Sequence, residues 1–121
     1  MRGYLIGLAL VAMAAPASAM DVATFLAKAD ALQATGPMAL FSGDLKLLKA
    51  EGTAAGNSIK SERLARTAAR QTPEYCPPTP SSMSSDELIA AMRTIPAAQR
   101  GQTTVRAAMK AMLIRKYPCR T

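Results

Sequence analysis

The chain has 121 residues and a formal net charge of +7, and half of its residues are hydrophobic, yet it contains no tryptophan and no histidine. The absence of histidine excludes Ser-His-Asp and Cys-His catalytic sets in their usual form and removes the commonest metal ligand. No glycine-rich phosphate-binding loop follows a predicted strand. We therefore expect no enzyme, no cofactor and no metal site.

The first 19 residues have the pattern of a secretory signal peptide. Arg2 supplies a positive charge, Leu5 to Ala15 form an apolar stretch, and Ala17-Ser18-Ala19 is an A-x-A cleavage site. The apolar stretch is about a dozen residues long, whereas a membrane-spanning helix needs roughly 20. An uncleaved anchor is the alternative, but it leaves the small residues at the cleavage site unexplained. We expect cleavage after Ala19 and one periplasmic domain comprising residues 20–121.

The region after residue 19 is predicted to be an all-α domain, a small bundle of four or five helices. Asp21 can cap a first helix over residues 22–34, which ends at Thr35-Gly36-Pro37. The apolar residues of this helix recur every three or four positions, as on one helical face. They are Val22, Phe25, Leu26, Ala29 and Leu32.

The next segment is predicted to be helical from Pro37 onwards, with an interruption at Ser42-Gly43. Glycine destabilises a helix interior by roughly 1 kcal/mol relative to alanine, so a break near Gly52 or Gly56 is the alternative to a single helix over residues 44–70. If the helix is continuous, its small residues allow another backbone to approach closely. One apolar stripe runs along it in steps of three and four residues: Phe41, Leu45, Leu48, Gly52, Ala55 and Ile59.

The C-terminal part is predicted to contain a stiff connector followed by two helices. Residues 75–82 include three prolines, which remove backbone donors and favour extended neighbours. Ser84 and Glu87 form a capping box for the next helix. Thr103 or Thr104 can cap the last helix. The expected buried face of the last helix comprises Val105, Ala108, Met109, Met112 and Leu113.

Cys76 and Cys119 are the two cysteines of the chain. In an exported protein such a pair is oxidised, and we predict one intrachain disulfide between them. A redox-active pair, the alternative, usually lies as close in sequence as C-x-x-C. The chain-entropy model assigns about 4 kcal/mol to closing a loop of this length.

Two further sets of side chains could support chemistry, and we interpret both as structural. Asp86 and Glu87 are adjacent carboxylates at the predicted start of a helix, where acids act as caps and oppose the helix dipole. Met109 and Met112 could offer thioether ligands to copper(I), but they fall on the apolar face of the last helix, where methionine usually fills the core.

Positive charge is concentrated in the C-terminal half. Residues 20–59 carry three basic and four acidic residues, whereas residues 60–121 carry eleven and four. Removing Arg2 with the signal peptide changes the net charge from +7 to +6. Two interpretations of this basic half remain: a solvated face, or a surface that binds an anionic cell wall or membrane. We expect no nucleic-acid partner, because the protein is predicted to lie outside the cytosol. Four cations fall on one surface at helical spacing: Lys60, Arg63, Arg66 and Arg70.

The C-terminal half also resembles the Rap/Tai-type immunity proteins, over about residues 75–119. The resemblance is carried by Tyr75-Cys76-Pro77, by Ser84-Ser85-Asp86-Glu87-Leu88, by an alanine-rich last helix and by Lys116-Tyr117-Pro118-Cys119. Members of this family are small exported helical proteins that protect a Gram-negative cell from type VI secretion amidase effectors, which cut its peptidoglycan. The first helix of this chain lacks a cysteine that members commonly carry, having Ala27 and Ala29 instead.

The resemblance implies an inhibitor, often a homodimer, that inserts an exposed loop into the cleft of a cell-wall amidase effector. Prolines in such a loop reduce the ordering cost of binding. A connector that contacts nothing is the alternative. Two functions follow: a periplasmic protein that binds a protein partner, or an envelope-associated structural protein that holds an anionic surface. The residues that match the exposed loop are Pro77, Pro78, Thr79, Pro80, Ser81, Ser82 and Met83.

Overall fold

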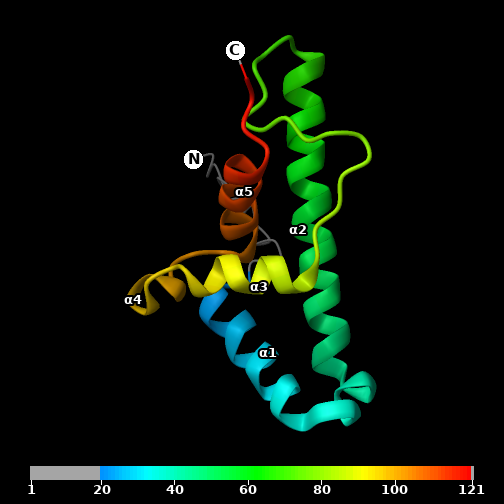
Figure 1. The fold of residues 1–121 in the computed structure, drawn as a ribbon, viewed down its shortest axis with the longest axis vertical. Helices are drawn as coiled ribbons and strands as arrows, with labels where there is room; N and C mark the ends of the chain where they lie inside the picture. The colour runs from blue at the N-terminus through cyan, green and yellow to red at the C-terminus, as the bar shows by residue number, and fades with distance from the viewer. Residues whose placement is uncertain (1–19, 121) are drawn as a thin grey trace, which may run out of the picture.

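In the computed structural model, which describes residues 20–120, the chain is all-α and, within that range, has no β-strand. The predicted fold class is confirmed, whereas the predicted signal peptide lies outside the described residues. Helix α2 runs along the long axis of the molecule, α5 packs beside its second half, and α1 diverges from its first half (Figure 1). The elements in chain order are α1 (Val22–Thr35), the 3₁₀ segment η1 (Gly36–Phe41), α2 (Gly43–Ala68), α3 (Ser85–Arg93), α4 (Ala97–Arg100) and α5 (Val105–Lys116).

Helix α1 begins where the sequence predicts. The Asp21 carboxylate accepts a hydrogen bond from the Thr24 backbone amide at 2.8 Å and caps the helix. Its pKa is lowered from the ordinary value by the hydrogen bonds from Thr24. The helix ends at Gly36, whose φ of 69° lies in the left-handed region that glycine adopts most easily. The backbone amide of Val22 donates to the Thr103 carbonyl at 2.8 Å, which ties the start of α1 to the start of α5.

Helix α2 is one continuous helix, so no break occurs at Gly52 or Gly56. The predicted interruption at Ser42 is confirmed: Ser42 is extended and caps α2. Phe41 was expected on the buried stripe, and that expectation was wrong, because the turn at Ser42 separates Phe41 from the helix and leaves its side chain 85% exposed.

The core lies where α1, α2, α3 and α5 meet. The predicted apolar faces of these helices supply it, since Phe25, Ile59, Met92 and Val105 are all buried. Met109 and Met112 are buried as well, which confirms their assignment to the core. None of the helices within residues 20–120 is long and apolar enough to cross a membrane.

The connector between α2 and α3 is fixed at one end by the disulfide between Cys76 and Cys119, which confirms the predicted pairing. The backbone amide of Cys76 also donates to the Tyr117 carbonyl at 2.8 Å. At the other end the predicted capping box is present: the Ser84 hydroxyl accepts from the Glu87 amide at 3.1 Å, and the Glu87 carboxylate accepts from the Ser84 amide at 3.0 Å. The connector is therefore held on both sides.

Candidate binding surfaces

An open groove with a volume of about 910 Å³ lies between α1, the first half of α2, and α3. It arises because α1 and α2 meet at η1 and diverge away from it, while α3 crosses their open side (Figure 1). The three helices contribute apolar side chains, some of them buried and others only partly covered by the rest of the chain. Its apolar lining includes Phe25, Leu32, Leu45, Leu48, Leu88 and Ile89.

Two glycines of α2 keep this groove deep. A Cβ atom added at Gly52 would meet no atom within 4 Å, and one added at Gly56 would meet only the Met109 sulfur at 3.8 Å. Neither glycine is therefore used for the close backbone approach that the sequence allows. Each glycine costs the helix roughly 1 kcal/mol relative to alanine. At Gly52 no neighbouring element within residues 20–120 occupies the space that the missing side chain leaves, and the groove takes it, whereas at Gly56 the Met109 side chain of α5 lies against that space.

Charged side chains lie at the edges of the groove. Lys49 comes from α2, while Asp86 and Arg93 come from the two ends of α3. Arg93 donates to the Asp30 carboxylate of α1 at 2.6 Å, so one ion pair bridges two walls of the groove. The rim is polar and the interior is apolar, which is the usual composition of a site that binds an apolar ligand or segment.

The loop Pro77–Met83 forms a second exposed surface. Pro78–Ser82 are exposed, while Pro77 and Met83 are partly buried at its two ends. Lys116 donates to the Ser82 carbonyl at 3.3 Å and to the Glu87 carboxylate at 2.6 Å, which fixes the second end against α5 and α3. The hydrogen bond from Lys116 is the main cause of the lowered pKa of Glu87.

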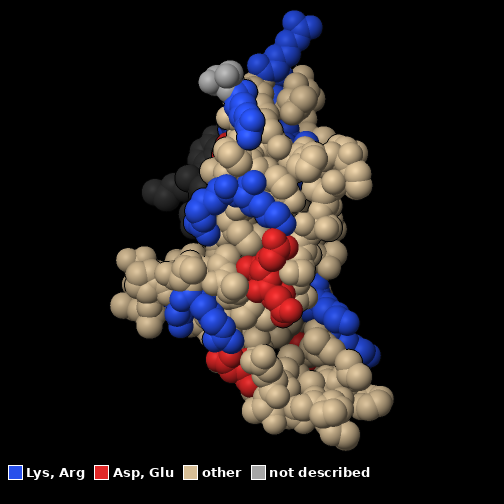
Figure 2. All heavy atoms as spheres, in the orientation of Figure 1, with Lys and Arg blue, Asp and Glu red and all other residues tan. Residues whose placement is uncertain are grey.

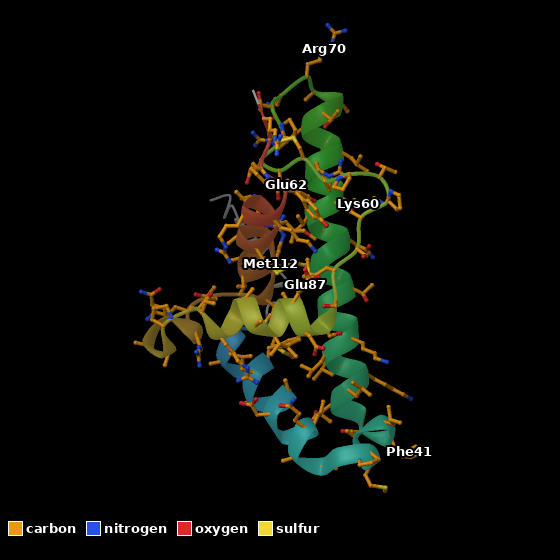
Figure 3. The ribbon with its side chains drawn as sticks, viewed as in Figure 1. Phe41, Lys60, Glu62, Arg70, Glu87 and Met112 are labelled. Carbon is orange, nitrogen blue, oxygen red and sulfur yellow. A yellow bond between two sulfur atoms is a disulfide. The ribbon has the colours of Figure 1, made fainter. Side chains whose placement is uncertain are left out.

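The predicted basic stripe is only partly on α2 and only partly free, because α2 ends at Ala68 and Arg70 follows it with a φ of 59°. Arg63 lies over the Tyr75 ring at 5.6 Å, and Arg66 donates to the Thr72 carbonyl at 3.0 Å. Lys60 and Arg70 are exposed and have no ion-pair partner in the part of the chain that the structure describes (Figure 3). Half of the predicted cationic surface is thus used to hold the connector against α2.

An ion-pair network joins α2 to α5 beside that stripe. Glu62 binds both Arg106 and Lys110, and Lys110 also binds Glu74 of the connector at 2.9 Å. Hydrogen bonds from Lys110 and Arg106 lower the pKa of Glu62 from 4.5 to about 2. An opening beside the network measures about 10 Å³. Since this is room for one water at most, the network is a structural feature.

The lowered pKa of Glu62 predicts a pH-dependent contribution to stability. Because Glu62 binds a proton more weakly in the folded than in the unfolded chain, its contribution is fully present above about pH 4.5 and is lost as the pH falls towards about 2. Wild type should exceed Glu62→Gln in urea midpoint at pH 7, and the gap should close between those two pH values. A gap that stays equal from pH 7 to pH 2 would contradict the assignment.

The described residues contain no group of three or more Cys, Asp and Glu side chains placed to hold a metal ion. Comparison of the chain with known protein families, with curated proteins and with solved structures found no match.

Of the two exposed surfaces, the loop was predicted from the sequence and the groove was not. The loop Pro77–Met83 was identified as the match to the exposed loop that the resemblance implies, and its central stretch Pro78–Ser82 is exposed. The groove was missed, although Gly52 and Gly56 on an otherwise apolar stripe were its signal.

Proposed function

We propose that the chain is a non-catalytic binding protein that takes up an apolar helical segment of a protein partner. The observation that carries this proposal is the groove of about 910 Å³ between α1, α2 and α3, with its apolar interior and polar rim. A groove that is open along its side suits a segment of chain better than an enclosed small molecule. Amphipathic helices bind such grooves through apolar residues at positions i, i+3 or i+4, and i+7.

The remaining charged clusters support a binding role rather than a catalytic one. Glu62, Glu74 and Glu87 are all engaged by lysine or arginine side chains. These cationic partners favour a structural role for the three carboxylates over a role as general acids or bases. The predicted signal peptide and the disulfide both favour a periplasmic location, because disulfides persist in oxidising compartments.

A second candidate is steric inhibition of a peptidoglycan amidase by the loop Pro77–Met83, as the resemblance to Rap/Tai-type immunity proteins implies. The observation that favours it is that the exposed stretch Pro78–Ser82 is held at one end by the disulfide of Cys76 and at the other by Lys116. A loop that is ordered before binding loses less conformational entropy when it enters a cleft.

The groove proposal is tested by filling the groove from its floor. In Gly52→Leu the new side chain meets no atom within 4 Å at its Cβ and extends into the groove, so the fold should tolerate it. Leucine also favours the helix more than glycine does. We expect tagged wild-type protein to retain partners from native envelope extracts, and Gly52→Leu to lose them while its melting temperature is equal or higher.

Two matched variants make the result specific. Ala54→Leu adds the same side chain to an exposed position of α2 that does not line the groove, and it should retain the partners. Ser81→Arg alters the exposed loop instead. Equal retention by wild type and Gly52→Leu would overturn the groove proposal. Loss with Ser81→Arg alone, together with an amidase among the retained proteins, would favour the second candidate.

A further inference from the structure

An apolar tip, defined as Met38, Leu40 and Phe41 of η1, forms one end of the long axis of the molecule. Their side chains are 65%, 72% and 85% exposed, the highest values among the large hydrophobic residues that the structure describes. Phe41 lies at the extreme end, opposite to Arg70 (Figure 3). Large apolar side chains gathered at one point of a surface commonly mark an interaction site.

The exposed charges beside the apolar tip that have no ion-pair partner in the described part of the chain are positive. Lys46 and Lys49 lie in the first two turns of α2, directly after the tip, and neither has an acidic partner within residues 20–120. The acids of this end are neutralised, since Asp44 pairs with Lys28 at 3.3 Å and Asp30 pairs with Arg93 at 2.6 Å.

The sequence count of three basic and four acidic residues in residues 20–59 therefore understates the positive field at this end. Of the two other acids, Asp21 caps α1 at its far end from the tip, and Glu51 is buried. On the face drawn in Figure 2, this end of the molecule has no acidic or basic atoms, with basic side chains next to it on the flank of α2 and acidic side chains on the side of α1. An apolar point beside unpaired cations is complementary to an anionic, partly apolar surface.

We propose that the apolar tip inserts into the surface of an anionic phospholipid membrane. Interfacial segments bind in this way when apolar side chains enter the boundary of headgroups and acyl chains while lysines face the anionic headgroups. The tip is convex and lies at the end of an elongated molecule (Figure 1), so it can reach a flat surface without displacing any other element. Leu40 of the tip also lines the groove, whereas Met38 and Phe41 do not, so these two side chains stay available to a membrane when the groove is occupied.

The absence of tryptophan from the chain allows a test at a single position. Phe41→Trp places the only indole at the tip, and Leu64→Trp places it at a position that is 51% exposed in the second half of α2. Both variants are made as full chains in an exporting host. We expect Phe41→Trp emission to shift to the blue with phosphatidylglycerol-containing vesicles and to be quenched by lipids brominated in their acyl chains. Leu64→Trp should do neither.

Two further variants measure the contributions of the apolar and the charged parts. Adding Met38→Ser to Phe41→Trp should weaken partition into anionic vesicles by about tenfold, as expected for losing one buried apolar side chain. Adding Lys46→Glu and Lys49→Glu should weaken it further, and pure phosphatidylcholine vesicles should bind poorly. Gly52→Leu should leave the Phe41→Trp response unchanged, which separates this proposal from that of the groove.

Three results would overturn the proposal. One is unchanged Phe41→Trp emission with anionic vesicles. Another is an equal response of Leu64→Trp, which would mean that other parts of the chain bind the lipid. The third is a blue shift that grows with protein concentration without lipid, since the apolar tip would then contact a second copy of the chain.

Discussion

Replacing Cys76 and Cys119 together by serine is expected to lower the free energy of unfolding by about 4 kcal/mol. The bridge joins residues 43 positions apart, and the chain-entropy model gives this value for closing such a loop in the unfolded state. Small domains have total stabilities of about 5 to 15 kcal/mol, so the loss is a large fraction of the whole. Urea unfolding followed by circular dichroism measures it.

The matched control is chemical reduction. A reductant should shift the urea midpoint of the wild type to that of the double serine variant, and it should leave the variant unchanged. A wild-type midpoint that is insensitive to complete reduction would show that the disulfide does not support the fold.

Met92→Ala is expected to lower the free energy of unfolding by about 2 to 5 kcal/mol, the range for truncating a buried methionine. The Met92 side chain is 0% exposed and belongs to the core cluster that joins α3 to its neighbours. The substitution removes apolar contacts and leaves a cavity. The surrounding helices are packed against one another, so they can close the cavity only in part.

Met38→Ala provides the same chemical change at a side chain that is 65% exposed. It should change the stability by no more than about 0.5 kcal/mol, as surface substitutions usually do. Urea midpoints of the two variants and the wild type provide the comparison. Similar losses at both positions would contradict the assignment of Met92 to the core.

The helices could be predicted where local signals agree with each other. Asp21, Ser84 and Thr104 each precede an apolar periodicity, and each caps a helix in the structure. The short helix α4 was not expected, because a single turn of Ala97–Arg100 carries no periodicity. Phe41 was misplaced because the stripe continues in sequence across Ser42, where the backbone leaves the helix.

Features that depend on the relative placement of helices could not be predicted. Glu62 lies 44 and 48 residues before its partners Arg106 and Lys110, and nothing local in the sequence links them. The stripe containing Gly52 was expected to contact a backbone, because small residues usually permit such contact. The divergence of α1 from α2 is a tertiary property, and it turns the same residues into the floor of a groove.

The position of the disulfide has a consequence for the width of the groove. The covalent ring closed by Cys76 and Cys119 contains α3 and α5, whereas α1 and α2 lie outside it. Helix α3, one wall of the groove, therefore belongs to the ring. Helices α1 and α2, the other two walls, form a helical hairpin outside it, which contacts the ring chiefly by non-covalent packing. The disulfide therefore does not fix the width of the groove, which depends on the ion pair between Arg93 and Asp30 and on the apolar packing of the core.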